Sequence, residues 1–351
     1  GRVLNMPYAD VDAVAKQVPT TQHITLADAL RLSKPLRDMY DEDAQVKKLI
    51  DTAMALEGMP RHASTHAAGV VITKNPVYTY VPLARNDEAI VCQYSMVTLE
   101  ELGLLKMDFL GLRNLTVLDD AVQMVRREKP DFSLNDIPHD DSAVYEMLTQ
   151  GRTCGVFQME SSGMTGVCVG LHPQSVEDLT AIVALYRPGP MESIPRFIAC
   201  KHDPSLISYK HPSLEPILAV TYGCIVYQEQ VIEIFRRLAG YSLGQADMVR
   251  RAMSKKKVKD IERERSAFVH GDSERGIAGC EANGIAADIA EKIYDEIYDF
   301  ANYAFNKAHA VCYAVVAYQT AWFKYHYPCE YMAALLTSVL DSSDKISEYI
   351  N

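Results

Sequence analysis

The stretch ELGLLKMDFLGLRNLT, residues 101–116, separates two differently patterned parts of the chain and decides the fold that the sequence predicts. Lys106 and Asp108 stand two residues apart within an otherwise apolar run. Side chains two residues apart in a β-strand point to the same face, so the pattern predicts a half-buried strand whose polar face lines a cleft. The opposite face would carry Leu105, Met107 and Phe109.

The apolar residues follow different spacings before and after this strand. Residues 1–63 place them three to four apart, which predicts helices. The expected N-caps of these helices include Thr25 and Asp41. Residues 64–113 contain short β-branched runs bounded by turn residues, which predict the strands of one small sheet, and Gly69 indicates a close approach of the backbone. Residues 114–351 return to helical spacing. The predicted fold class is therefore mainly α with a small β-sheet (α+β).

Composition limits the classes of protein to which the chain can belong. The 351 residues are 48% hydrophobic, which is ample for more than one core. No apolar run reaches the roughly 18 residues that a transmembrane helix needs. The formal charge of −11 argues against a protein that coats nucleic acid through its overall charge. The eight cysteines stand singly without a C-x-x-C pair, so no zinc site is expected, and free cysteines fit a reducing cytoplasm.

The two ends of the sequence predict an internal fragment of a longer chain. It begins on Gly1 without a Met or a signal peptide, and it ends on Asn351 inside a helical pattern that has no stop signal.

The Lys106 and Asp108 pair admits two interpretations. The first is an internal salt bridge on the surface of a sheet. The second is a carboxylate that ligates a divalent metal beside a lysine that meets phosphate oxygens, because Mg²⁺ prefers carboxylate oxygens and shares them with substrate phosphates. A two-metal site needs two or more carboxylates close together, and no Asp-x-Asp in a strand pattern occurs elsewhere in the sequence.

A second polar group interrupts two helical patterns near residue 306. It consists of Tyr303, Asn306, Lys307 and His309. Asn306 is a good N-cap, so we expect the chain to break there and a new helix to begin, whose free N–H groups with Lys307 and His309 would bind an anion. The alternative is an ordinary capped turn. The aromatic residues that follow favour a core position over a base-stacking platform, and they are Tyr313, Tyr318, Trp322, Phe323, Tyr325 and Tyr327.

A third candidate is the pair Arg250 and Arg251, followed by three lysines at 255–257. Adjacent arginines on a helix can clamp phosphates through their planar guanidinium groups. The alternative is a solvated helix face, which suits the lysines better than the arginines because apolar residues flank the arginine pair.

Several motifs together resemble a known family. They are RHASTHAAGVVIT, LLKMDFLGLRNLT, VFQMESSGM, ALYRPGP, TYGCIVYQEQV, DMVRRAMSKKK and YAFNKAHAVCYAVVAYQTAWFKYHYP, in this order. The sequence resembles the catalytic α subunit of bacterial DNA polymerase III, the C-family replicative DNA polymerase, and KMDFLGL resembles its DnaE type. The resemblance covers nearly the whole chain.

The resemblance implies roles for the candidate residues. Three palm aspartates hold two Mg²⁺ ions in this family; Asp108 matches the third of them, and Lys106 matches a palm lysine near the incoming triphosphate. The nucleotide-binding positions of the fingers match Arg250, Arg251, Tyr303 and His309. Asn306 and Lys307 share the last motif. The first two aspartates would precede Gly1, so the 351-residue chain alone is expected to be inactive.

The resemblance also implies domains and partners. Residues 1–63 would form a helical thumb, 64–113 part of the palm, and 114–351 the fingers. The expected partners are primer–template DNA, an incoming dNTP, the sliding clamp and other replicase subunits, with no membrane and a cytoplasmic location. Two other functions stay open on the residues alone: a non-catalytic helical interaction module, and a metal-dependent hydrolase with a carboxylate on one strand.

Overall fold

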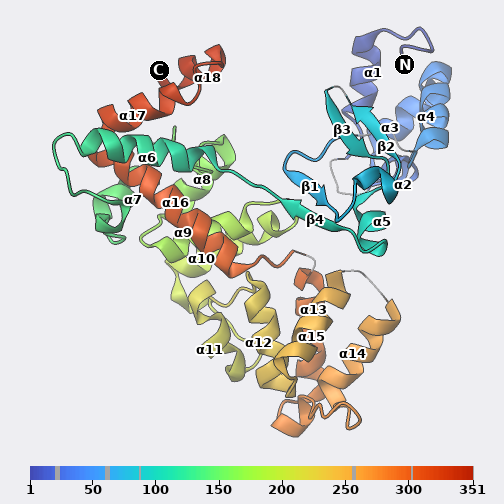
Figure 1. The fold of residues 1–351 in the computed structure, drawn as a ribbon. Helices are drawn as coiled ribbons and strands as arrows, with labels where there is room; N and C mark the ends of the chain where they lie inside the picture. Colours follow the sequence, from blue (N-terminus) through green and yellow to red (C-terminus); the bar gives the residue numbers. More distant parts are fainter. Residues whose placement is uncertain (20–23, 60–63, 87, 255–257, 302, 351) are drawn as a thin grey trace. The chain divides into compact units, whose positions relative to one another are not determined.

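A computed structural model describes the chain except for residues 20–23, 60–63, 87, 255–257, 302 and 351, and the side chains of 254, 258–261 and 301 also lie outside the described set. The chain divides into two compact units, residues 1–111 and 112–351 (Figure 1). Helices predominate in the chain, and the strands form small antiparallel sheets, which confirms the predicted fold class. In the part of the chain that is described, no helix is long and apolar enough to cross a membrane.

Four helices open the first unit. They are α1 (Tyr8–Ala15), α2 (Leu26–Leu32), α3 (Lys34–Glu42) and α4 (Ala44–Leu56). Their apolar faces meet in a small core made of Val14, Ala29, Leu36, Val46 and Ile50. The Thr25 side chain accepts a hydrogen bond from the Asp28 N–H, which confirms it as the N-cap of α2.

The expected N-cap at Asp41 is wrong. Asp41 lies inside α3, because the chain keeps helical geometry through Glu42. Asp43 is the first residue to leave that geometry, with φ −118° and ψ 115°, and its carboxylate accepts from the N–H groups of Gln45 and Val46. Three acidic residues, at 41–43, precede α4, and the one directly before its first residue caps it.

The strands form two separate ribbons, where the sequence predicted one sheet. In the first, β1 (Gly69–Ile72) pairs with β4 (Leu105–Asp108), and in the second β2 (Leu83–Asn86) pairs with β3 (Ala89–Cys92), both antiparallel. The 3-10 turn η1 (Val77–Thr79) separates β1 from β2, and α5 (Met96–Glu101) separates β3 from β4. Pro76 and Pro82 flank η1 and cannot donate to a ladder, which helps to keep β1 and β2 apart.

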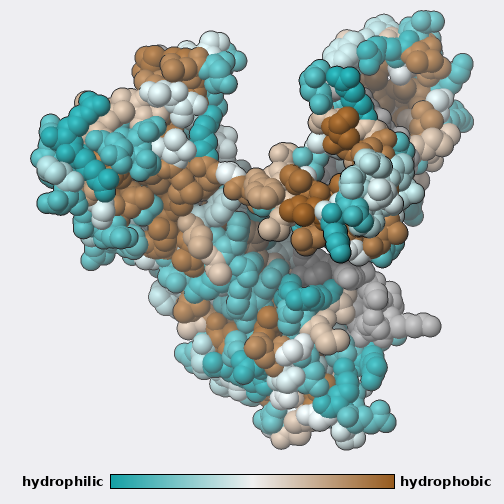
Figure 2. Space-filling model, viewed as in Figure 1, coloured by the Kyte–Doolittle hydropathy of each residue, from teal (hydrophilic) through white to brown (hydrophobic). Residues whose placement is uncertain are grey.

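The apolar face of β4 is exposed in this chain, where the sequence predicted that it would be half-buried. Leu105, Met107 and Phe109 are 57%, 46% and 63% exposed. The register places Val70 opposite Met107 and Ile72 opposite Leu105, and these two residues are exposed as well. Hydrophobic surface therefore gathers over the β1–β4 ribbon (Figure 2). The alternation of the strand was predicted correctly, but which face is covered depends on the elements packed against it.

The second unit is built of helices and short 3-10 turns. Its α-helices are α6 (Arg113–Val125), α7 (Ser142–Thr149), α8 (Ser162–Leu171), α9 (Val176–Leu185), α10 (Ile194–His202), α11 (Glu215–Leu218), α12 (Gln228–Ala239), α13 (Leu243–Ser254), α14 (Val258–His270), α15 (Ala287–Ala301), α16 (Lys307–His326), α17 (Pro328–Thr337) and α18 (Ser343–Ile350). Its 3-10 turns are η2 (Leu134–Asp136), η3 (Pro190–Ser193), η4 (Pro204–Leu206), η5 (Pro212–Leu214), η6 (Ala219–Thr221) and η7 (Glu281–Asn283).

Two hydrophobic cores fill this unit. The first lies among α6–α10 and α16–α18, where α16 packs against α9 and α6 (Figure 1). Tyr318, Trp322 and Phe323 of α16 are buried there, as expected for core rather than base-stacking aromatics. Tyr313 and Tyr327 are half-buried, and the core position expected for Tyr325 is wrong, because its side chain is 41% exposed. The second core lies among α11–α15. Residues 214–227 and 304–310 contribute side chains to both cores, so the polar group at 303–309 lies where the cores join.

Candidate functional site

Lys106 and Asp108 lie on one face of β4, as the period of the strand predicted. The Lys106 Nζ is 2.6 Å from Asp108 Oδ1, and their side chains are 17% and 43% exposed. The hydrogen bond from Lys106, together with its charge, holds the pKa of Asp108 below its ordinary value. The structure thus contains the ion pair of the first interpretation, and it also leaves the Asp108 carboxylate accessible at the end of a strand, as a metal ligand must be.

Gly69 lies opposite Asp108 in the ladder and leaves no room for a side chain. A β-carbon at Gly69 would stand 2.6 Å from the Lys106 Cε, 2.8 Å from the His66 Nδ1 and 3.0 Å from the Asp108 Oδ1. The close approach expected at this glycine is therefore confirmed. His66 was missed by the sequence interpretation. Its Nδ1 accepts from the Gly69 N–H at 2.6 Å and from the Ala68 N–H at 3.1 Å, which fixes the chain where it enters β1.

Asp108 fits a divalent metal by its chemistry but does not complete a site. A carboxylate oxygen is the ligand that Mg²⁺ prefers. Among the described residues, no group of three or more His, Cys, Asp or Glu side chains is placed to hold a metal ion. This chain therefore offers Asp108 as one ligand of such a site.

Asp247 holds both candidate arginines of α13. Its Oδ1 accepts from Arg250 Nε and Nη2 at 3.0 and 2.8 Å, and its Oδ2 lies 2.8 Å from Arg251 Nε. These two hydrogen-bonded guanidinium groups lower the pKa of Asp247. Arg250 is 17% exposed and Arg251 is 69% exposed, so Arg251 has the freer reach toward a ligand. The three lysines at 255–257 lie outside the described residues, so their expected role stays a prediction.

The chain breaks at Asn306, as expected. Helix α15 ends at Ala301 and α16 begins at Lys307. Asn306 has φ −68° and ψ 120°, and its Oδ1 accepts from the His309 N–H at 2.8 Å, which confirms the predicted N-cap.

The expectation of free N–H groups in the first turn of α16 is wrong for two of them. The Lys307 N–H donates to both carboxylate oxygens of Glu229, at 3.1 and 3.0 Å, and the His309 N–H is taken by the cap. The Lys307 Nζ pairs with Glu177 Oε2 at 3.2 Å. Acidic residues of this chain satisfy positive groups that the sequence interpretation had left for an external anion.

Tyr303 is held by the loop RPGP at 187–190, which belongs to the motif ALYRPGP. The Arg187 Nη2 donates to the Tyr303 carbonyl oxygen at 2.6 Å, and its guanidinium lies 4.1 Å from the centroid of the Phe305 ring. Gly189 has φ 102°, and a β-carbon there would lie 2.3 Å from Tyr303 Cδ1. The Tyr303 ring thus lies directly on the backbone of this loop. The His309 ring packs against Phe305 and Tyr313.

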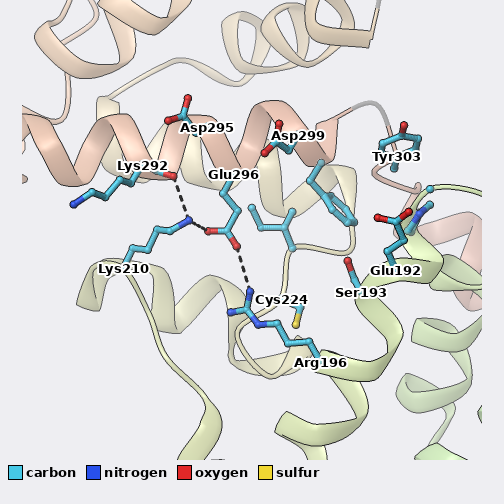
Figure 3. A pocket seen from close by; sticks show the side chains of 14 residues that line it. Glu192, Ser193, Arg196, Lys210, Cys224, Lys292, Asp295, Glu296, Asp299 and Tyr303 are labelled. Atoms are coloured by element: carbon cyan, nitrogen blue, oxygen red, sulfur yellow. Dashed lines mark hydrogen bonds and ion pairs between the residues drawn. The ribbon is translucent and has the colours of Figure 1, made fainter. Parts of the chain in front are cut away.

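A cavity of about 610 Å³ opens beside Tyr303 (Figure 3). Glu296 on one wall pairs with Lys210 and, at 3.9 Å, with Arg196. The charged residues that line the cavity are Glu192, Asp295, Glu296, Asp299, Arg196, Lys210 and Lys292. Acids outnumber bases in this lining, which disfavours a triphosphate inside the cavity.

Comparisons with known proteins agree with one another. Residues 1–111 match the family described as "Bacterial DNA polymerase III alpha NTPase domain", and residues 114–276 match "Bacterial DNA polymerase III alpha subunit finger domain". The chain is 46% identical to the DNA polymerase III subunit alpha of Bacillus subtilis (strain 168) over 352 residues, covering 100% of this chain and 31% of that protein. It is 46% identical to the subunit of Thermus aquaticus (99% and 29%) and 43% identical to that of Escherichia coli (strain K12; 99% and 30%). The chain thus spans about a third of the length of these curated relatives.

Proposed function

The chain belongs to the family of the bacterial DNA polymerase III alpha subunit, and we propose that it forms part of the catalytic centre of a DNA-directed DNA polymerase. Such a centre adds deoxynucleotides from dNTPs to the 3′ end of a primer on a DNA template. The observation that carries the proposal is the geometry of β4, whose last residue Asp108 presents a 43% exposed carboxylate 2.6 Å from the Lys106 ammonium group. It lies in a chain of which 1–111 and 114–276 both match this family.

In the proposed mechanism, Asp108 is one ligand of a divalent metal site that other carboxylates of the full-length subunit complete. Bound Mg²⁺ would supply charge stabilisation for the attacking and leaving oxygens of the displacement. Lys106 holds the carboxylate of Asp108 in an ion pair and can offer its ammonium group to a phosphate oxygen.

The second unit supplies the nucleotide contacts in this proposal. Arg251 and Arg250 bind phosphate oxygens through charge-assisted hydrogen bonds. Tyr303 and His309 offer an exposed ring and imidazole for the nucleotide, and Asn306 and Lys307 begin the helix that carries His309. Primer–template DNA and dNTP are therefore the proposed substrates.

The 351-residue chain alone is expected to show no primer extension. A two-metal mechanism needs carboxylates on both ions, and the described residues bring no third metal-ligating side chain to Asp108. The measurement is extension of a labelled primer with Mg²⁺ and all four dNTPs, on material whose helical circular dichroism shows that it is folded. Extension that disappears on replacing Asp108 would show that the chain holds the complete ligand set.

Gly69→Ala in a full-length subunit that contains this sequence is expected to lower kcat by about 10- to 100-fold, because small displacements of catalytic groups have effects of this order. The atoms that a new β-carbon would meet belong to the side chains of Lys106, His66 and Asp108, which can move, so the strands should still pair. The steady-state extension rate measures the loss of kcat, and the thermal midpoint of the same preparation measures any loss of folding stability.

Gly111→Ala is the matched control, because a β-carbon there meets nothing within 4 Å. This control should keep the kcat of the wild type. A Gly69→Ala subunit with unchanged kcat would mean that the geometry of Lys106 and Asp108 does not limit the reaction.

A further inference from the structure

The sequence YQEQ, residues 227–230, holds the stretch of chain that leads into α16. Tyr227 and Phe305 form a parallel β-bridge: the Gln228 N–H donates to the Phe305 carbonyl at 2.9 Å, and the Phe305 N–H donates to the Val226 carbonyl at 3.2 Å. The Gln228 side chain donates to the Ala304 carbonyl at 3.0 Å. The backbone just before Asn306 is thus fixed to the start of α12.

Glu229 makes the contact that reaches the proposed nucleotide-binding residues themselves. Both of its carboxylate oxygens accept from the Lys307 N–H, and its Oε1 also accepts from Asn306 Nδ2 at 2.9 Å. Glu229 lies in the first turn of α12 and contacts the first residue of α16. A carboxylate is stabilised at the N-terminus of a helix, and the Glu229 carboxylate lies at the N-termini of both α12 and α16.

The Asn306 amide links Glu229 to His309. Its Nδ2 donates to Glu229 while its Oδ1 accepts from the His309 N–H. An amide reversed about its long axis would lose both hydrogen bonds. Glu229 therefore sets the orientation of the cap, and through the cap the first turn that carries Lys307 and His309.

We propose that Glu229 is a positioning residue for nucleotide binding, which holds Asn306, Lys307 and His309 in the arrangement that receives the incoming dNTP. This inference rests on the proposed function. The contacts of Glu229 favour a positioning role over general stabilisation. They go to the two residues at the start of α16 and not to either hydrophobic core. The opposite possibility is that Glu229 occupies a phosphate position and competes with the nucleotide.

Steady-state primer extension by full-length subunits carrying Glu229→Ala or Glu229→Gln tests the proposal. We expect Glu229→Ala to raise KM for dNTP about 10-fold while kcat changes less than about 3-fold, the pattern of lost binding contacts. Glu229→Gln keeps an acceptor oxygen for Lys307 and should recover most of this loss. A KM that is unchanged or lower in Glu229→Ala would overturn the proposal, and a lower KM would identify Glu229 as a competitor of the phosphates.

Glu233→Ala is the matched control on the same helix. Glu233 pairs with Arg236 and Arg237 on an exposed face of α12, one turn after Glu229, so its removal should leave KM unchanged. An equal rise in KM in Glu233→Ala would show that the effect is one of α12 stability and would overturn the positioning role.

A swapped pair keeps the test decisive even if Glu229→Ala does not fold. Asn306→Asp retains the cap oxygen for the His309 N–H but places two carboxylates together, and should raise KM. Adding Glu229→Gln to Asn306→Asp supplies an amide donor to the new carboxylate and should bring KM back toward the wild type. Failure of this rescue, with an unchanged thermal midpoint, would contradict the proposed link between the two residues.

Arg251→Ala separates this inference from the proposed function. If Arg251→Ala lowers catalytic efficiency and Glu229→Ala does not raise KM, the positioning role alone is wrong. If the wild-type subunit does not extend a primer, or Arg251→Ala leaves its efficiency unchanged, the failure lies in the proposed function.

Discussion

Primer extension by a full-length subunit carrying Asp108→Asn is expected to fall about 10³-fold or more in kcat. A metal ligand contributes several kcal/mol of transition-state stabilisation, and each 1.36 kcal/mol changes the rate about tenfold. Asparagine has nearly the same size as aspartate, so the β1–β4 ladder, which consists of backbone hydrogen bonds, should persist. The loss should therefore appear in kcat and in the dependence on Mg²⁺, with little change in the thermal midpoint.

Asp12→Asn is the matched control for this variant. Asp12 pairs with Lys16 at 2.7 Å on the surface of α1 in the same unit, and a surface ion pair of this kind contributes little. The control should extend primers at the wild-type rate. If Asp108→Asn did the same, Asp108 would be a partner of Lys106 and nothing more.

Arg251→Ala is expected to reduce kcat/KM for dNTP by about 30- to 900-fold, which corresponds to about 2–4 kcal/mol for a charge-assisted contact to a reacting triphosphate. Arg251 is exposed and its described contact is to Asp247, so its removal should leave the packing of α13 intact. Arg250 is largely buried, so Arg250→Ala should lower the thermal midpoint as well as the efficiency. Single-nucleotide incorporation over a range of dNTP concentrations gives both parameters.

Arg237→Ala provides the comparison for Arg251→Ala. Arg237 is an exposed guanidinium on α12 that pairs with Glu233 four residues before it, just as Arg251 pairs with Asp247. Its removal should leave kcat/KM unchanged. Equal behaviour of the two variants would return the arginine pair to the solvated-face interpretation.

The parts of the site that follow from local chemistry were predicted from the sequence. The period of a strand placed Lys106 beside Asp108, and the capping preference of asparagine placed the start of α16 at Asn306. The close approach of other residues to the backbone at Gly69 was predicted because glycine has no side chain to prevent it. The helical spacing of Asp247 with Arg250 and Arg251 could have revealed their pairing, because residues three and four apart lie on one helix face.

The parts that depend on distant segments were missed. Arg187 meets Tyr303 across 116 residues of sequence, and Glu229 meets Lys307 across 78. No local pattern identifies such partners. The prediction that Leu105 and Met107 would be buried was wrong for the same reason. Alternation predicts that a strand has two faces, but not which of them another element covers.

The central claim is that Asp108 ligates a catalytic metal, and a crystal structure of a full-length subunit with primer–template DNA, a non-hydrolysable dNTP analogue and Mn²⁺ in place of Mg²⁺ tests it most directly. Anomalous scattering locates the Mn²⁺. We predict a peak within about 2.2 Å of an Asp108 carboxylate oxygen, close to the distance that carboxylates keep from small divalent ions. A metal bound elsewhere, with Asp108 paired to Lys106 alone, would contradict the claim.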